Sequence, residues 1–219
     1  MTQMRTVGGC GTTVHAAEKL HRRWIGIDVT HLAIGLIEHR LRSAFSGVRF
    51  QVHGTPKDVD AARDFFGRND STKKEFEKWA VTLIGFQPQA KKGADGGLDG
   101  LEWFGPAKAH RAVVSVKGGK SVTVEMMRSL DAVTKAQGAD VGILLSLEPP
   151  TKGAVDWAKQ AGMFQIPGHA TSVPRLQVVT IEEALKLGPD AARLPLRHDD
   201  TFKKAPREQA KGAAGDLFG

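Results

Sequence analysis

The sequence predicts an α/β protein in which a mixed sheet flanked by helices follows an incomplete parallel α/β unit. Two observations carry this prediction. Between residues 71 and 188, segments with helical spacing of apolar residues alternate with short β-type runs, an order typical of sheets with helices on both faces. Between residues 7 and 41, a glycine-rich turn, a helical segment, an apolar strand and a second helix follow one another, which indicates a parallel α/β unit.

The 219 residues divide into four predicted regions. We expect the incomplete α/β unit at residues 1–45, a linker at 46–70, the main domain at 71–188 and a disordered tail at 189–219. The linker is rich in Gly, Pro and charged residues. The tail is rich in Ala, Gly and charge and has too little apolar periodicity to build a core.

Composition limits the classes of function. The formal net charge of +7 and the pI of about 9.6 favour a polyanionic partner or a phosphate substrate. The only cysteine, Cys10, leaves no disulfide within the chain, which fits a reducing cytoplasm. No apolar run approaches the roughly 18 residues that span a bilayer, and no signal peptide is visible. We therefore expect a cytoplasmic location and no membrane partner.

The N-terminal unit contains a pattern that is typical of nucleoside-binding folds. A Gly-x-Gly turn opens a helix, and a carboxylate ends the next strand, so that backbone amides and the acid can hold a cofactor. Gly9, Gly11, Thr12 and Asp28 occupy these positions. The alternative is that the glycines only form a turn.

The main domain begins with a predicted capping box at Thr72 and Glu75. The helix that follows has apolar residues at a 3.6-residue period and ends at Gly85. Two strands then form a hairpin. The predicted order of the remaining elements is strand 98–104, strand 112–117, a helix from about 123, strand 141–145, a helix after Thr151, strand 176–179 and a helix capped by Thr180.

The hairpin brings candidate catalytic residues together. Ser115 and Lys117 share a strand face because they are two residues apart, and antiparallel pairing brings Asp99 beside them. Such a carboxylate and a backbone carbonyl, that of Val116, can hold Mg²⁺ with several waters, while the lysine orients or deprotonates the attacking water. The alternative is that Asp99 closes a turn and Lys117 is a solvated strand end.

Glycines and lysines flank the hairpin and suit contact with phosphates. Glycines let the backbone approach a phosphate chain closely, and lysines supply the counter-charge. The predicted DNA-binding residues are Lys91, Lys92, Gly118, Gly119 and Lys120.

The same segment resembles the core of the PD-(D/E)xK nuclease superfamily, in particular Mrr-type restriction endonucleases. The resemblance runs from about Glu75 to Leu187. The strings that carry it are Phe76-Glu77, Gly93-Ala94-Asp95-Gly96-Gly97-Leu98-Asp99 and Ser115-Val116-Lys117. It implies a restriction-endonuclease-like fold, double-stranded DNA as the partner, metal binding by Asp99, catalysis by Lys117 and support of the metal site by Glu77.

One position departs from the pattern of that superfamily. The residue two before the lysine is usually Glu, Asp or Gln, and here it is Ser115. A hydroxyl is a far weaker Mg²⁺ ligand than a carboxylate. Glu125 and Asp131, in the following helix, are candidates for the missing acid. The departure bears on activity more than on fold.

The N-terminal unit resembles the C-terminal part of an amino-type, beta-class-like DNA methyltransferase that uses S-adenosylmethionine. The string Gly9-Cys10-Gly11-Thr12-Thr13 followed by residues 23–28 carries the resemblance, which covers only about Val7–Leu41. It implies an incomplete Rossmann-like half-domain. The catalytic DPPY-type motif is absent from the chain. We therefore expect S-adenosylmethionine to bind only in a full-length methyltransferase context, and the cofactor site here to be vestigial.

These observations predict a restriction–modification-type protein, in which a Mg²⁺-dependent DNA endonuclease-like domain is attached to a methyltransferase remnant and a homodimer is possible. Two alternatives stay open. One is a catalytically inactive module that only binds DNA, which Ser115 favours. The other is the C-terminal fragment of a working site-specific DNA methyltransferase, whose nuclease-like part recognises the target.

Overall fold

The computed structural model describes residues 3–6, 11–28, 30–89 and 97–197. The chain divides into two compact units, of which the first contains the described residues up to His53 and the second those from Gly54 onward. Each unit has its own hydrophobic core. None of the described helices is both long and apolar enough to cross a bilayer.

The first unit is a short parallel β-α-β arrangement followed by a helix. Strands β1 (Gln3–Thr6) and β2 (Trp24–Ile27) pair in parallel, and helix α1 (Thr12–Lys19) connects them. Helix α2 (His31–Ala44) follows and is capped by the hydroxyl of Thr30. The helix, strand and helix expected from the sequence are present, and β1 is a strand that the sequence prediction did not include.

The second unit alternates helices and strands over most of its length. Its elements in chain order are α3 (Val59–Gly67), α4 (Asp70–Leu83), β3 (Gln87–Pro88), β4 (Gly100–Phe104), the 3-10 helix η1 (Pro106–Lys108), β5 (His110–Lys117), α5 (Val124–Ala136), β6 (Val141–Ser146), α6 (Lys152–Gln160), β7 (Met163–Gln165), β8 (Ser172–Pro174), β9 (Leu176–Thr180), α7 (Ile181–Leu187) and the 3-10 helix η2 (Gly188–Ala191).

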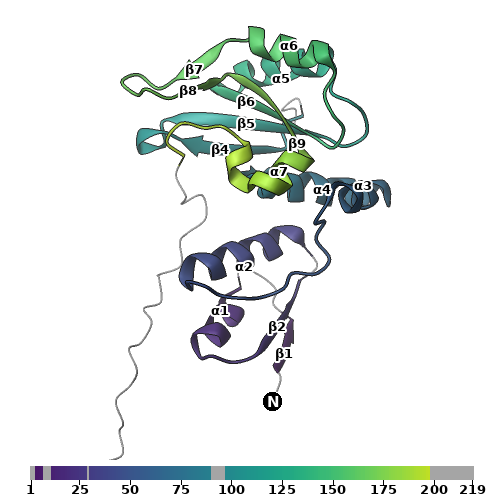
Figure 1. The fold of residues 1–219 in the computed structure, drawn as a ribbon, viewed down its shortest axis with the longest axis vertical. Helices are drawn as coiled ribbons and strands as arrows, with labels where there is room; N and C mark the ends of the chain where they lie inside the picture. Colours follow the sequence, from purple (N-terminus) through teal and green to yellow (C-terminus); the bar gives the residue numbers. More distant parts are fainter. Residues whose placement is uncertain (1–2, 7–10, 29, 90–96, 198–219) are drawn as a thin grey trace, which may run out of the picture. The chain divides into compact units, whose positions relative to one another are not determined.

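A five-stranded mixed sheet organises this unit. The strand order is β3-β4-β5-β6-β9, with antiparallel pairing from β3 to β5 and parallel pairing from β5 to β9. Helices α5 and α6 lie on one face of the sheet, and α4 and α7 lie on the other (Figure 1). The mixed sheet flanked by helices that the sequence predicts is therefore confirmed.

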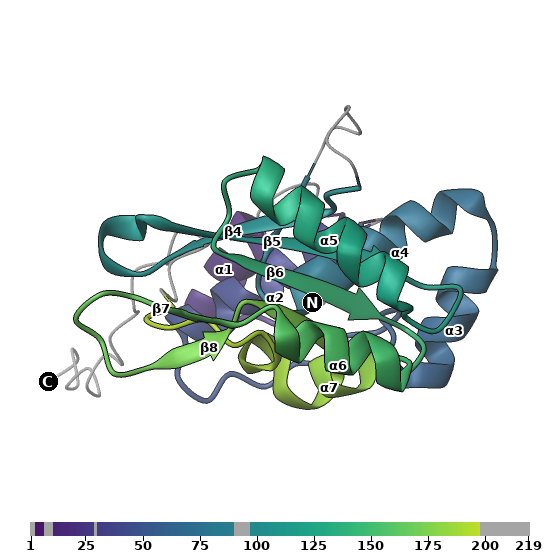
Figure 2. The same ribbon diagram turned by 90° about the horizontal axis from the view of Figure 1, so that it is seen from above.

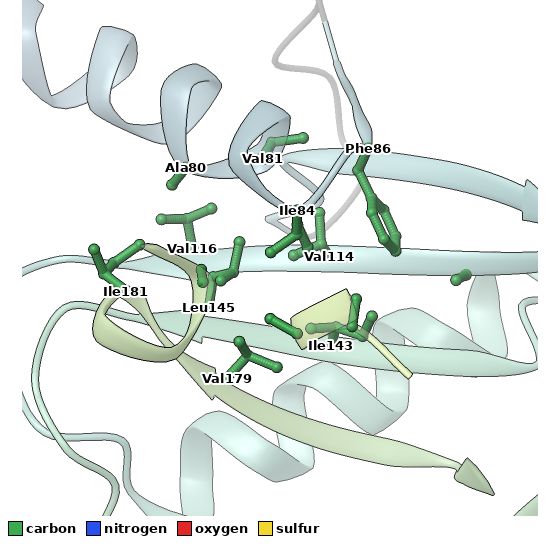
Figure 3. Close-up of a cluster of buried hydrophobic side chains, with 14 of the residues drawn as sticks. Ala80, Val81, Ile84, Phe86, Val114, Val116, Ile143, Leu145, Val179 and Ile181 are labelled. Carbon is green, nitrogen blue, oxygen red and sulfur yellow. The ribbon is translucent and has the colours of Figure 1, made fainter. Parts of the chain in front are cut away.

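The face of the sheet towards α4 and α7 carries the main hydrophobic core. Figure 3 shows Ala80 of α4 and Ile84, the residue that follows α4, next to β5, with Ala80 beside Val116 and Ile84 beside Val114. Because later residues of α4 meet earlier residues of β5, the helix and the strand run in opposite directions. The start of α4 therefore lies towards the carboxyl end of β5.

The opposite face is covered by α5 and α6, which contact each other along the sheet (Figure 2). Met127 and Leu130 of α5 and Ala154 of α6 are buried against Leu144 of β6. Since both helices follow parallel strands and return over the sheet, their N-terminal turns lie at the carboxyl ends of β5 and β6. This end of the sheet is where the predicted catalytic residues are found.

Helix α4 begins earlier than the sequence prediction placed it. Its cap is Asn69, whose side chain accepts the N–H of Thr72 at 2.9 Å, while the Thr72 hydroxyl accepts the N–H of Asn69 at 3.1 Å. Thr72 is thus the inner partner of a capping box rather than the cap itself. The predicted cap at Thr180 is present, and Glu183 completes a capping box there.

Two segments outside the predicted main domain are folded with it. Helix α3 lies in the stretch expected to be a linker, and its Ala62 and Phe65 are buried in the main core. At the other end, Ala191 and Ala192, at the start of the predicted tail, are also buried. The Arg197 guanidinium donates to the carbonyl of Ile84. The rest of the predicted tail, 198–219, lies outside the described residues.

Candidate active site

Asp99 directly precedes β4 and is held there by hydrogen bonds to β5. Its N–H donates to the carbonyl of Val114 at 2.9 Å, and its carboxylate Oδ2 accepts the N–H of Val116 at 2.7 Å. The regular pairing of β4 with β5 ends at Gly100, opposite Val114. If β4 began earlier in the chain, a backbone carbonyl of that extension would accept the N–H of Val116. Here the Asp99 carboxylate accepts this N–H instead.

The last residues of β5 alternate between core and the opposite face. Val114 and Val116 belong to the core under α4, so Ser115 and Lys117 point to the face that α5 covers. Ser115 is 8% exposed, and Lys117 is half-buried. Asp99 thus lies just before the start of β4, and Ser115 and Lys117 lie at the end of the neighbouring strand β5.

The backbone of Val116 faces the Asp99 carboxylate. In a strand, the N–H and C=O of one residue project towards the same neighbouring strand. Because the N–H of Val116 points to Asp99, its carbonyl also opens on that side. Asp99 Oδ1 and the Val116 carbonyl give an oxygen-only donor set of the kind that Mg²⁺ prefers, with waters completing its coordination.

No larger set of metal ligands is gathered in the described part of the chain. There, no group of three or more His, Cys, Asp or Glu side chains is placed to hold an ion. Among the described residues, the groups that lie together beside β5 and could hold a metal are the Asp99 carboxylate and the Val116 carbonyl. A carboxylate at position 115 would add a further metal ligand, but this position is occupied by Ser115.

Helix α4 rests directly on the start of β4. A Cβ at Gly100 would come within 2.5 Å of Val81 and 2.9 Å of Val114, so no side chain fits there. Glu77 lies on the same side of α4 as Val81, one turn nearer the start of the helix. The N-terminal half of α4 lies towards the carboxyl end of β5. Glu77 therefore lies in the part of α4 that is nearer to Asp99 and Lys117.

The α-carbon of Gly118 packs closely against helix α3. A Cβ at Gly118 would overlap the ring of Phe66, which comes from α3. At Gly119 the same ring is at an ordinary distance of 3.7 Å, and Gly119 and Lys120 are exposed. Of the predicted phosphate contacts, Gly119 and Lys120 are therefore accessible, while Lys91 and Lys92 lie outside the described residues.

Helix α3 is also tied to the carboxyl end of β6. Arg63 binds Glu148 with two hydrogen bonds, of 2.8 Å and 3.2 Å. These hydrogen bonds with Arg63 lower the pKa of the Glu148 carboxyl below its ordinary value, and they raise the pKa of Arg63. The pair and the Phe66–Gly118 contact hold α3 against the two loops that follow β5 and β6.

The structure separates the two candidates for the missing acid. Asp131 accepts from Lys135 at 2.6 Å and from Arg175 at 3.2 Å. Arg175 directly precedes β9, whose start pairs with the start of β6, so Asp131 lies towards the opposite end of the sheet from Lys117. Glu125 is in the first turn of α5, 77% exposed and 3.4 Å from Arg128. Glu125 is the candidate that lies at the site's end of the sheet.

In the N-terminal unit, packing and capping already account for part of the predicted cofactor pattern. Gly11 has a φ of 75°, and a Cβ there would lie 2.6 Å from Ile37. Asp28 Oδ1 accepts from the N–H of Thr30 at 2.9 Å and from its hydroxyl at 3.0 Å. Thr12 is the first residue of α1, and Gly9 lies outside the described residues.

Sequence reasoning missed two residues at this end of the fold. The helix that contains Phe66 could have been predicted, since Asp58 is a typical cap and apolar residues follow at 59, 62, 65 and 66. Ser146 ends an otherwise apolar strand and is fully buried opposite Lys117. Its type alone gave no signal, because a serine after an apolar run also marks an ordinary strand end.

Comparison with known proteins agrees with this fold. Residues 68–170 match the family model Mrr_cat, described as a restriction endonuclease. The matched segment contains Glu77, Asp99, Ser115 and Lys117, and the mixed sheet of the second unit is consistent with a restriction-endonuclease-like fold. No curated protein matches the chain. The family match does not extend to the N-terminal unit.

Proposed function

We propose that this chain hydrolyses phosphodiester bonds of double-stranded DNA with Mg²⁺, in the cytoplasm. The observation that carries the proposal is the Asp99 carboxylate, which lies 2.7 Å from the N–H of Val116, the residue directly before Lys117 in β5. These residues lie within the segment that matches restriction endonucleases. The net charge of +7 favours the binding of a polyanion.

Each residue of the site has a distinct role in this proposal. Asp99 and the Val116 carbonyl hold the ion, which when bound activates a water and neutralises charge on the phosphate. Lys117 orients the attacking water and stabilises the negative charge that develops on the phosphate oxygens. Glu77 supports the metal site from α4. Gly119 and Lys120, together with Lys91 and Lys92, contact the DNA backbone.

The rival reading is a nuclease fold that binds DNA without cutting it. Ser115 favours this reading, because the edge of β5 then offers one carboxylate where two would hold the ion more firmly. Glu125, at the same end of the sheet, is the acid that the nuclease reading would use in its place. A second copy of the chain, which many double-strand cuts require, is part of the nuclease proposal.

Substitution of Lys117 by alanine distinguishes the two readings. We expect Lys117→Ala to lower the rate of plasmid cleavage in Mg²⁺ by about 10²–10³-fold, since it removes an electrostatic partner of the reacting phosphate. DNA affinity should stay within about tenfold. Lys120→Ala is the matched control: it also removes one lysine, and it should flatten the salt dependence of binding by about one unit, while the cleavage rate at saturating protein stays at the parental value.

The outcomes of this experiment are distinct. If the parent protein cuts and Lys117→Ala cuts equally fast, the proposed role of Lys117 is wrong. If the parent protein binds DNA but does not cut it at any concentration of Mg²⁺ or Mn²⁺, the binding-module reading replaces the nuclease reading.

For the N-terminal unit, we propose a remnant of a DNA methyltransferase. The observations that favour it are the parallel pairing of β1 with β2 around α1, with Gly11 at the turn and Asp28 after β2. The alternative that the chain is a fragment of a working methyltransferase predicts a catalytic motif encoded upstream of Met1 in the same reading frame. Sequencing the upstream DNA tests that alternative.

A further inference from the structure

Ser146 is a buried hydroxyl without a partner in the part of the chain that the structure describes. It is the last residue of β6, its side chain is completely inaccessible to solvent, and its Oγ makes no hydrogen bond there. Buried hydroxyls are nearly always hydrogen-bonded, because an unpaired one loses its bonds to water without replacement. Alanine would fill the same position without this loss, so the serine needs an explanation.

The two strand neighbours of Ser146 narrow the choice of partner. In the parallel register, Ser146 lies between Lys117 of β5 and Thr180 of β9. The Thr180 hydroxyl is already used, since it donates to the Glu183 carboxylate at 3.0 Å and accepts the Glu183 N–H at 3.2 Å. Lys117 has no hydrogen bond or ion pair from its ammonium group to another described residue. Of the two neighbours, Lys117 is therefore the one whose ammonium N–H groups can donate to Ser146.

Ser146 and Lys117 also point to the same face of the sheet. Leu144, two residues before Ser146, is buried against α5 and α6, and side chains two residues apart share a face. Lys117 projects to this face because Val116 projects to the other. The serine hydroxyl thus lies beside the stem of the lysine, on the side of β5 away from Asp99.

We propose that Ser146 is a positioning residue, whose Oγ accepts a hydrogen bond from the Lys117 ammonium when DNA is bound. This proposal rests on the nuclease function proposed above. A lysine has four flexible side-chain bonds and three ammonium donors. With one donor held by Ser146, the ammonium stays over the end of β5, and its other donors face the water and the phosphate at Asp99.

The test is Ser146→Ala in the full chain, measured by three methods. Thermal unfolding should show equal or greater stability, because the substitution removes an unpaired buried hydroxyl. Single-turnover cleavage should slow by about tenfold or more, with DNA affinity unchanged. Nuclear magnetic resonance of isotope-labelled lysine should show the Lys117 ammonium protected from solvent exchange in the parent protein bound to non-cleavable DNA, and unprotected in the variant.

Thr134→Val is the matched control. Thr134 is a second fully buried hydroxyl, in α5, but it donates to the carbonyl of Leu130 at 2.7 Å. Its loss should lower stability and leave both the cleavage rate and the Lys117 signal unchanged.

The outcomes separate this proposal from the nuclease function itself. A Lys117 signal that is the same in parent and Ser146→Ala overturns the role of Ser146, as does a variant that cuts at the parental rate or fails to fold. A parent protein that never cuts overturns the nuclease function, and the resonance measurement then still decides whether Ser146 holds the lysine.

Discussion

At the scale of single residues, Asp99 has two roles that substitution can separate. Its carboxylate satisfies the N–H of Val116 at the strand edge, and in our proposal it also binds Mg²⁺. Asparagine retains an oxygen that can accept the same N–H but carries no charge. Alanine retains neither the acceptor nor the charge. The first role concerns stability and the second concerns metal affinity.

We therefore expect Asp99→Asn to abolish measurable Mg²⁺ binding while changing the free energy of unfolding by less than about 0.5 kcal/mol. Asp99→Ala should abolish binding as well and cost a further ~1–2 kcal/mol, because the Val116 N–H loses its acceptor. Titration calorimetry and chemical denaturation of the three proteins measure both effects. Equal Mg²⁺ affinity in the parent and the asparagine variant would rule out Asp99 as a ligand.

The sequence was informative about these residues because strand alternation and hairpin pairing are local. Ser115 and Lys117 could be placed on one face from their spacing, and the turn at Gly105 and Pro106 indicates the hairpin that brings Asp99 close. The backbone bond between Asp99 and Val116 was not predictable, since it depends on where β4 stops. Ser146 was missed because its relation to Lys117 depends on the register of a parallel pair.

At the scale of elements, the anchoring of α3 by the Arg63–Glu148 pair has a measurable dependence on pH. Arg63 lowers the pKa of Glu148 in the folded protein. A lowered carboxyl pKa contributes stability above the pKa of the unfolded chain, and this contribution is lost as the pH falls through the lower folded value. The contribution should therefore be present at neutral pH and absent in acid.

Glu148→Gln should slightly lower the free energy of unfolding at pH 7, and the difference from the parent should shrink as the pH falls below about 4. Chemical denaturation at several pH values measures this. Glu182→Gln is the control, because Glu182 pairs with Lys186 within α7 alone and also has a lowered pKa. A pH-independent difference for Glu148→Gln would show that the ion pair is not its cause.

The boundaries of elements were harder to predict than their order. Most helices and strands of the main domain lie where the apolar periodicity predicted them, since each buries one face. Helix α3 was not predicted, although it has a capping Asp58 and apolar residues at helical spacing, because the charged and glycine-rich sequence around it indicated a linker. Its contacts with α4, with the Gly118 loop and with Glu148 show that it belongs to the domain.

At the scale of the whole molecule, the described part of the N-terminal unit contains a two-stranded parallel sheet, which is smaller than a complete cofactor-binding sheet. Its Asp28 is bonded to Thr30, and Gly11 is covered by Ile37. We expect the full chain to show no measurable binding of S-adenosylmethionine in titration calorimetry, because the described part of this unit offers two strands, whereas a dinucleotide-type crevice lies between two halves of a larger sheet. Micromolar affinity would contradict this prediction and favour a working methyltransferase unit.

The position of β6 has a consequence for the chain while it is being synthesised. All six residues of β6 are buried, and its outer edge is closed only by β9, which emerges from the ribosome about thirty residues later. Until then an apolar strand with free backbone groups is open to pairing with another nascent chain. Slow synthesis over residues 147–175 would lengthen this vulnerable period. The yield of folded protein should therefore depend on translation speed in this segment more than in any part of the chain before it.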